Sequence, residues 1–316
     1  MQSLTMLRPG FRALVPAALR QPVSSLLALA AEPAGAPAAP DPAPDSPFVL
    51  GGRYRLIERI GEGGMGIVWR GVDLDLEEIV AIKFLREDMA TDPRLRGLFR
   101  REIKFARRVT HRNVARVFEF GHTDNLYYLT MEFIAGESLQ ARLNRGGARP
   151  SMWVLELAAG LCRGLAAALA VNVVHGDIKP GNILLAPGRG GVITDFGIAR
   201  ALSEPLSGEE SMGGTPYYMA PEQVTYGELI PASDVYALGV VLFEALTACS
   251  PWPNCEPQAL LELKAQGYEP DLAYLAPTLS SDWIELLSEC LCAEPAGRPR
   301  DVRSLLLRLA RLRSFL

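Results

Sequence analysis

The pattern of apolar and polar residues divides the chain into a strand-rich part and a helix-rich part. Between residues 53 and 134, short apolar runs separated by Gly and Asp turns predict strands at 54–60, 67–72, 79–85, 114–121 and 126–132. Beyond residue 136, apolar residues recur at helical spacing and predict helices at 151–171, 234–248, 281–291 and 301–312. We therefore expect two lobes, a sheet lobe followed by a larger helical lobe.

One helix is predicted within the sheet lobe, at residues 93–109. Its apolar positions fall on one stripe and its basic residues fall opposite. Glu102 is the only charged residue on the apolar stripe. An unpaired carboxylate packed against the sheet would cost about 3–5 kcal/mol, so Glu102 is expected to have a basic partner.

The first 47 residues differ in composition from the rest. Residues 33–47 hold six of the 24 prolines, which predicts an extended linker. Residues 1–31 contain three arginines and no acidic residue, and prolines interrupt any helix there. We expect a disordered Ala/Pro-rich leader and linker over 1–47, with a targeting peptide as the alternative, and a folded part that begins near Arg53.

Composition and charge narrow the class of protein. The 316 residues are 49% hydrophobic and 22% charged, with a formal net charge of −4, a globular balance without the basic surplus of a nucleic-acid-binding protein. The five cysteines form no CxxC pair and only three histidines are present, which disfavours structural zinc and a disulfide framework. No uncharged apolar run reaches the roughly 18 residues of a membrane-spanning helix. We therefore expect a cytoplasmic protein with no integral membrane segment.

A glycine-rich stretch follows the first long predicted strand. Gly61, Gly63 and Gly66 would allow the backbone to approach phosphate groups closely. The chain continues as a strand after Gly66 and lacks the Gly-Lys-Ser/Thr of a P-loop, so neither a dinucleotide-binding turn nor a P-loop fits. These residues alone are consistent with two interpretations, an ordinary glycine hairpin and a hairpin that covers phosphate groups.

Lys83 lies in an otherwise apolar predicted strand, residues 79–85. Its ammonium group must leave the core or meet an anion, and Glu102 lies 19 positions further along. Considered separately, Lys83 and Glu102 could each extend the charged end of the side chain into solvent. With the glycine-rich stretch just upstream, the two together favour a lysine held by Glu102 and directed at phosphates.

Two further polar features follow the helix predicted at 151–171. Asp177, Lys179 and Asn182 combine a carboxylate, a cation and an amide at fixed offsets. This set suits proton acceptance, charge neutralisation and metal coordination around one oxygen. Asp195 stands 13 residues after Asn182, at the end of an apolar run, where a carboxylate is a sound ligand for Mg²⁺.

Taken together, these motifs resemble the eukaryotic-like (Hanks-type) serine/threonine protein kinases, above all the bacterial members. The resemblance covers about residues 53–313 and rests on motifs in the family's order: Gly61/Gly63/Gly66, Lys83, Glu102, Asp177/Lys179/Asn182, Asp195-Phe196-Gly197 and Ala220-Pro221-Glu222. It implies the α+β, two-lobed protein kinase fold, with a small antiparallel-sheet lobe with one helix at 53–134 and a larger, mainly helical lobe at 137–313. It also implies ATP-dependent transfer of the γ-phosphate to Ser or Thr hydroxyls of protein substrates, including the protein itself.

The same resemblance assigns catalytic and metal-binding roles. Asp177 would accept the proton of the substrate hydroxyl, and Lys179 would steady the transferring phosphoryl group. Asn182 and Asp195 would hold Mg²⁺, or Mn²⁺, at the β- and γ-phosphates of ATP.

The nucleotide would be bound by a larger set of residues, which the resemblance also supplies. They are Ile60, Gly61, Glu62, Gly63, Gly64, Met65, Gly66, Val68, Ala81, Lys83, Glu102, Met131, Glu132, Ile134 and Leu184. Adenine would lie between Val68 and Ala81 on one side and Leu184 on the other. Backbone groups of Glu132 and Ile134 would read its edge, and Met131 would lie at the back of the pocket.

Residues 214–222 resemble the segment that docks a peptide acceptor, which small-molecule kinases lack. Arg298 resembles the arginine that pairs with Glu222, and Asp234 resembles the acid that braces the catalytic loop. Lys179 followed by a proline is the Ser/Thr version of that loop. With no sensor domain expected, regulation would come through residues 1–47, the activation segment, dimerisation or a separate partner.

One position departs from the family pattern and keeps alternatives open. The family commonly carries His-Arg-Asp, and this chain has His175-Gly176-Asp177. Because that arginine receives an activation-segment phosphate in the family, we expect activity to be largely independent of phosphorylation between Asp195 and Glu222. His-Gly-Asp also resembles the loop of aminoglycoside and choline kinases, so a small-molecule phosphotransferase is one alternative. A pseudokinase scaffold that binds nucleotide without transfer is the other.

Overall fold

The structure is a computed structural model, and it describes residues 48–63, 66–85, 103–104, 106–123, 126–196 and 216–313. All of these residues belong to one compact unit, Pro47–Leu316. Within this unit an antiparallel sheet is followed along the chain by a helical lobe, as the sequence pattern predicts.

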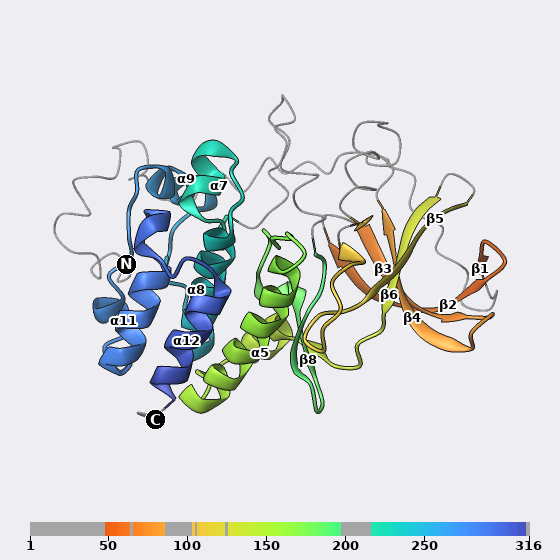
Figure 1. Ribbon diagram of the computed structural model, residues 1–316, viewed down its shortest axis with the longest axis horizontal. Helices are drawn as coiled ribbons and strands as arrows, with labels where there is room; N and C mark the ends of the chain where they lie inside the picture. The colour runs from red at the N-terminus through yellow and green to blue at the C-terminus, as the bar shows by residue number, and fades with distance from the viewer. Residues whose placement is uncertain are drawn as a thin grey trace, which may run out of the picture. The chain divides into compact units, whose positions relative to one another are not determined.

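The first lobe is a six-stranded antiparallel sheet in the order β1-β2-β3-β4-β6-β5, coloured orange to yellow in Figure 1. Its strands are β1 (Val49–Leu50), β2 (Tyr54–Gly63), β3 (Gly66–Asp73), β4 (Glu78–Leu85), β5 (Val117–Thr123) and β6 (Leu126–Glu132). The run of apolar residues in β4 reflects burial on both faces of this central strand. Ile82 packs in one apolar cluster with Tyr54, and Ala81 packs in another with Ile103.

The alternation of β4 decides where its lysine points. Successive side chains of a strand point to opposite faces, so Lys83 shares the face of Ala81, which packs against Ile103. Ile103, Lys104 and Ala106 are the helical residues described within the helix predicted at 93–109. Ile103 and Ala106 are buried and Lys104 is exposed, in agreement with the predicted stripe. Residues 93–102 and 105 lie outside the described residues, and residues 107–109 are a turn and loop, so the described helix ends at Ala106, before the predicted end at 109.

Two of the differences from the predicted sheet boundaries have a clear physical reason. The sheet starts before Arg53, because Leu50 is fully buried and pairs with Tyr54 across a short turn. The strand predicted to start at 114 starts at Val117. Ahead of it, the N–H of Ala115 donates to the carbonyl of Ile193 at 2.8 Å, and a bridge joins Val114 to Ile193. This backbone therefore pairs with the second lobe.

The second lobe is mainly helical and contains a small three-stranded sheet. Its helices are α4 (Leu139–Asn144), α5 (Ser151–Leu169), α7 (Pro221–Tyr226), α8 (Pro231–Thr247), α9 (Pro257–Ala265), α10 (Leu272–Leu275), α11 (Ser281–Cys290) and α12 (Val302–Leu312). The small sheet has the order β7-β8-β9, with β7 (Glu137–Ser138), β8 (Ile183–Ala186) and β9 (Gly190–Ile193). Single 3-10 turns lie at Pro180–Asn182 and Pro295–Gly297.

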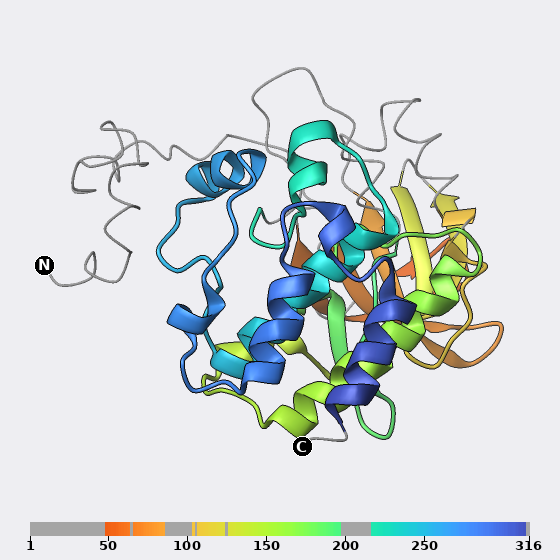
Figure 2. The ribbon, with the colours of Figure 1, turned by 60° about the vertical axis from the view of Figure 1, so that its left-hand side comes forward.

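The core of this lobe is built around α8 and α5. Residues of α8 are buried on nearly all sides, which accounts for a helix that is apolar nearly all round. It starts at Pro231, three residues before the predicted start, because proline suits the first turn of a helix. In Figure 1 and Figure 2, α12 runs alongside α5, and the two helices contact each other.

One described helix, α5, is long and apolar enough to cross a membrane by length and composition. Of its most apolar window, 56% is buried inside the protein, in contact with α8, α12 and β9. A buried core helix passes the same test, so α5 is weak evidence for a membrane span.

Candidate active site

The loop between α5 and β8 brings the predicted base, cation and amide together. The Asp177 carboxylate oxygen Oδ2 accepts hydrogen bonds from Lys179 Nζ at 2.7 Å and from Asn182 Nδ2 at 2.9 Å. Asn182 Nδ2 also donates to the backbone carbonyl of Asp177 at 2.8 Å. The side chain of Asp177 is 9% exposed and that of Lys179 is 23% exposed. The carboxylate is therefore fixed in orientation and still has some contact with solvent.

His175 and Asp234 fix the backbone that carries Asp177. The Asp234 carboxylate accepts the N–H groups of His175 and Gly176 at 2.9 and 2.8 Å, which confirms the bracing contact expected of Asp234. His175 is fully buried. Its Nδ1 accepts the N–H of Asp177 at 3.2 Å, and its Nε2 lies 2.9 Å from the carbonyl of Thr194. In this arrangement Nδ1 acts as an acceptor and Nε2 carries a ring proton.

Lys83 reaches Asp195 from the other lobe. Lys83 Nζ lies 2.7 Å from Asp195 Oδ1, and Lys83 is 4% exposed. Burial alone would raise the pKa of Asp195, but the charge and hydrogen bond of Lys83 outweigh it, so the pKa is lowered and the carboxylate is ionised. The predicted partner of Lys83, Glu102, lies outside the described residues.

Asn182 and Asp195 supply donors of the kind that a magnesium ion takes. The amide nitrogen of Asn182 is engaged by Asp177, so its remaining side-chain donor to a metal is an oxygen. Asp195 offers an ionised carboxylate, and its backbone φ of +59° is a left-handed conformation that aims the side chain. The N–H of Thr194 donates to the carbonyl of Asn182 at 2.9 Å, which ties the two stretches together. Oxygen ligands at this position fit Mg²⁺ or Mn²⁺.

The glycine-rich stretch is a hairpin of β2 and β3. Gly61 pairs with Val68, and Gly63 pairs with Gly66 at its end. Gly66 has φ of +138°, and a Cβ there would lie 1.8 Å from the carbonyl oxygen of Phe84, so this position requires glycine. Ile60 and Glu62 are exposed on the hairpin. The predicted residues Gly64 and Met65 lie outside the described residues.

The residues predicted around adenine lie in two apolar clusters. Val68, Ala81 and Met131 belong to one cluster with Ile103 in the sheet lobe. Ile134 and Leu184 belong to the other. A cavity of about 10 Å³ is lined by Met131, Asp195 and Phe196, among others. The N–H of Glu132 donates to the carbonyl of Arg116 at 2.8 Å and is engaged within the protein.

Gly176 has neighbours that no sequence motif indicates. Its φ is +77°, and a Cβ there would lie 2.7 Å from Leu229 Cδ2. Its carbonyl accepts from Gln223 Nε2 at 3.0 Å. Leu229 and Gln223 lie about 50 positions away in the chain, and Gln223 comes directly after the Ala220-Pro221-Glu222 motif. Glu137 pairs with Arg142 and Arg145.

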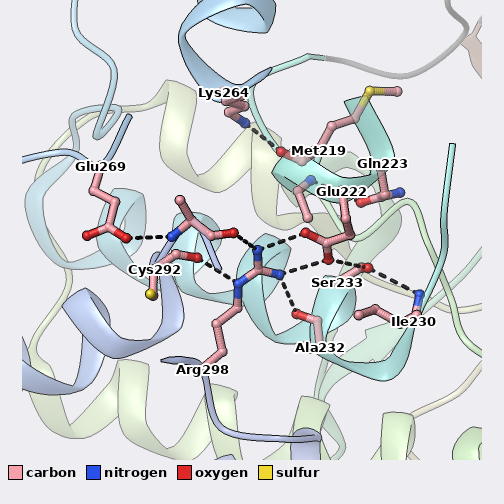
Figure 3. A network of polar contacts seen from close by, with 12 residues as sticks. Met219, Glu222, Gln223, Ile230, Ala232, Ser233, Lys264, Glu269, Cys292 and Arg298 are labelled. Carbon is pink, nitrogen blue, oxygen red and sulfur yellow. Dashed lines mark hydrogen bonds and ion pairs between the residues drawn. The ribbon is translucent and has the colours of Figure 1, made fainter. Parts of the chain in front are cut away.

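A buried network behind the loop holds the start of α7 (Figure 3). Arg298 Nη1 and Nη2 each lie 2.8 Å from one carboxylate oxygen of Glu222, which confirms the predicted pair. Ser233 Oγ donates to Glu222 at 2.6 Å. Arg298 also donates to three backbone carbonyls, those of Ala232, Cys292 and Ala293. Burial raises the pKa of Glu222, but Arg298 and Ser233 lower it by more, so it lies below its ordinary value.

Comparison with known proteins gives a consistent result. A family model described as "Protein kinase domain" matches residues 54–306. Serine/threonine-protein kinase PknA of Mycobacterium tuberculosis is 36% identical over 258 residues, covering 80% of this chain and 59% of the relative. PrkC of Bacillus subtilis is 33% identical over 250 residues, covering 79% of this chain and 39% of the relative. The chain therefore spans well under two thirds of the length of these relatives.

Solved structures show the same fold. The crystal structure of the PknI kinase domain of M. tuberculosis aligns with a TM-score of 0.70 at 22% identity, covering 85% of this chain and 99% of that one. The two-lobed fold expected from the motifs is confirmed by this likeness, and the resemblance to bacterial Hanks-type kinases by the relatives above.

Proposed function

The chain belongs to the protein kinase domain family, and from this premise we propose that it transfers the γ-phosphate of ATP to Ser or Thr hydroxyls of protein substrates, including itself. The observation that carries the proposal is the constellation around Asp177. Its carboxylate is held by Lys179 and Asn182, while Lys83 from the other lobe meets Asp195. A base, a cation and two metal-ligand candidates with these neighbours suit phosphoryl transfer.

Each residue has a part in this chemistry. Asp177 accepts the proton of the acceptor hydroxyl as its oxygen attacks the γ-phosphorus, and the bond from that phosphorus to the β,γ-bridging oxygen breaks to release ADP. Lys179, hydrogen-bonded to that carboxylate, neutralises charge on the phosphoryl group. Lys83 orients the phosphates of ATP, and the glycine hairpin of β2 and β3 covers them with backbone N–H groups. Mg²⁺ or Mn²⁺, held by Asn182 and Asp195, would neutralise the charge of the β- and γ-phosphates.

A protein acceptor is favoured over a small alcohol by the segment that leads into α7. Residues 216–219 are held by side chains from two helices, Glu244 of α8 and Lys264 of α9, and they lie in the part of the chain that resembles a peptide-docking segment. A pseudokinase is disfavoured because Lys83, Asp177, Asn182 and Asp195 are all present. A cytoplasmic location and dimerisation are part of the same proposal.

The test is transfer of radiolabelled γ-phosphate in the presence of Mg²⁺. The purified chain is offered a lysate of its own host, an aminoglycoside or choline, and no acceptor, with a Lys83→Met variant as the matched negative control. We expect label on protein Ser and Thr residues, mapped by mass spectrometry, and none with the variant. Label on the small alcohols alone, or on no acceptor, would overturn the proposal.

A further inference from the structure

Lys264 is a fully buried lysine in the last turn of α9. Its exposed fraction is 0%, and only four of the 32 basic residues in the chain are lysines. Its Nζ donates to three backbone carbonyls in one short stretch, those of Pro216 at 3.0 Å, Tyr217 at 2.9 Å and Met219 at 2.7 Å. Figure 3 shows the bond to Met219. This cation is therefore bound to the backbone directly before α7.

The contacts described for Lys264 suit its ammonium form and include no carboxylate. Its three N–H donors match the three carbonyl acceptors. Nζ also lies 5.0 Å from the ring centroid of Tyr236 and 5.6 Å from that of Trp252, where a ring face attracts a cation. Burial lowers the pKa of Lys264 to about 7, and the charge of Arg298 adds to this lowering, whereas Cys255 opposes it. An apolar side chain would fill the same space, so volume alone does not account for an amino group.

The three carbonyls converge on one point, and the backbone conformation depends on what lies there. Carbonyl oxygens carry partial negative charge and repel one another at short range, so this conformation depends on the cation between them. The compact ammonium of lysine fits such a centre, whereas the planar fork of arginine does not. Two other tethers hold side chains of the same stretch: Tyr217 Oη donates to the carbonyl of Cys255 at 2.7 Å, and Tyr218 Oη donates to Glu244 Oε2 at 2.8 Å. Lys264 holds the backbone itself.

The stretch is connected to the catalytic loop through α7. Glu222 of this helix is fixed by Arg298, and Gln223 donates to the carbonyl of Gly176, the residue before Asp177. The residues proposed to bind ATP lie in other elements. A change in residues 216–219 would therefore alter the position of a bound peptide relative to the base and leave the nucleotide contacts in place.

We propose that Lys264 is a positioning residue that shapes residues 216–219 for the acceptor polypeptide and so sets the affinity and selectivity for the sequence around the phosphorylated Ser or Thr. The inference rests on the proposed function, because it assigns the peptide-docking part of the same site. It separates peptide recognition from phosphoryl transfer, and that separation is measurable.

The test compares Lys264→Met with Lys104→Met, which removes an exposed lysine. A peptide made from a site mapped on the wild-type protein serves as acceptor. For Lys264→Met we expect KM for the peptide to rise by about 10-fold or more, with kcat and KM for ATP within about two-fold of wild type. A positional peptide library should show a broader preference next to the acceptor residue. Lys104→Met should match wild type in every parameter.

Several outcomes would overturn the inference. If the wild type phosphorylates the peptide and Lys264→Met has an unchanged KM for it, the inference alone fails. The same holds if kcat falls, KM for ATP rises and the melting temperature drops together, because a merely structural role predicts that pattern. If Lys264→Met does not fold, Lys264→Gln, which keeps two N–H donors, replaces it in the test. A KM for the peptide between those expected for wild type and Lys264→Met would support the inference, and an unchanged KM would overturn it. If the wild type phosphorylates no peptide or protein, the proposed function fails and the inference with it.

Discussion

The cluster around Asp177 and the network around Glu222 are built from the same kinds of groups, yet they differ in how completely the protein compensates their charges. Asp177, Lys179 and Asp195 retain 9%, 23% and 22% side-chain exposure. Glu222 and Arg298 retain 5% and 0%, and Arg298 donates to backbone carbonyls as well as to the carboxylate. Charges in the first cluster are open to reactants, whereas those in the second are fully engaged within the fold. The two regions should therefore respond to substitution in opposite ways.

The largest expected effect is a loss of activity at the cluster around Asp177 without a loss of stability. Asp177→Asn removes a proton acceptor but keeps an oxygen that can accept from Lys179 and Asn182. We expect phosphate transfer to fall by about 10²–10⁴-fold while the melting temperature stays within about 2 °C of wild type. Steady-state transfer and thermal unfolding of the same preparation measure both. A large loss of stability would show that Asp177 is part of the scaffold after all.

The next largest expected effect is a loss of stability at the network around Glu222. Glu222→Gln leaves the buried Arg298 guanidinium without its counter-charge, so the free energy of unfolding should fall by about 3–5 kcal/mol in urea titrations. The double variant Glu222→Gln/Arg298→Met should recover part of that loss, because the uncompensated charge is gone. Equal stability of the single variant and wild type would contradict the assignment of this pair to the scaffold.

The same pair predicts a pH dependence with a definite sign. The folded pKa of Glu222 is lower than its ordinary value of 4.5. The unfolded chain therefore takes up a proton more readily than the folded one. The stabilisation is complete above pH 4.5 and is lost as the pH falls through the folded pKa. Glu222→Gln should lack this part of the acid dependence, which unfolding curves between about pH 3 and pH 6 would reveal.

The two regions also differ in how far the sequence predicted them. Asp177, Lys179 and Asn182 lie within six positions of one another, so their chemistry was readable as a local motif. The pairing of Glu222 with Arg298 is predictable only from the family resemblance, because the two residues lie 76 positions apart. Lys264 and Leu229 were not predicted, since each acts on residues about 45 to 55 positions away and local patterns do not encode which distant backbone a side chain meets.

The fold shows the same division. Long strands and helices with clear periodicity, such as β6 and α5, were predicted to within a few residues. The short helices α4, α7, α9 and α10 were not predicted, because one or two turns hold too few apolar positions to show a period. The start of β5 was misjudged at 114, where an apolar run pairs with Ile193 of the second lobe instead of its neighbouring strand. Tertiary contacts decided that boundary.

The smallest expected effect concerns the catalytic loop itself, which lacks a positive charge at Gly176. It sharpens the comparison with the network around Glu222, where the charges are paired. Gly176 occupies the position where the family commonly has arginine. Its φ of +77° disfavours any side chain there, and a Cβ would come within 2.7 Å of Leu229 Cδ2. Gln223, a neutral amide, donates to its carbonyl. No guanidinium at this position can receive an activation-segment phosphate, so Ser203, Ser207 and Ser211, which lie outside the described residues, should be dispensable as phosphate acceptors.

Replacing these three serines together by alanine should therefore leave the rate of phosphate transfer within about two-fold of wild type. Thr215 is kept, because the family resemblance places it beside Asp177 and Lys179. Both proteins are assayed after phosphatase treatment as well as before, so that phosphorylation carried over from expression does not mask a requirement. A collapse of the rate in the triple variant would mean that another basic group reads a phosphate on this segment. The catalytic loop would then depend on a charge supplied from outside it, whereas the network around Glu222 contains both of its charges.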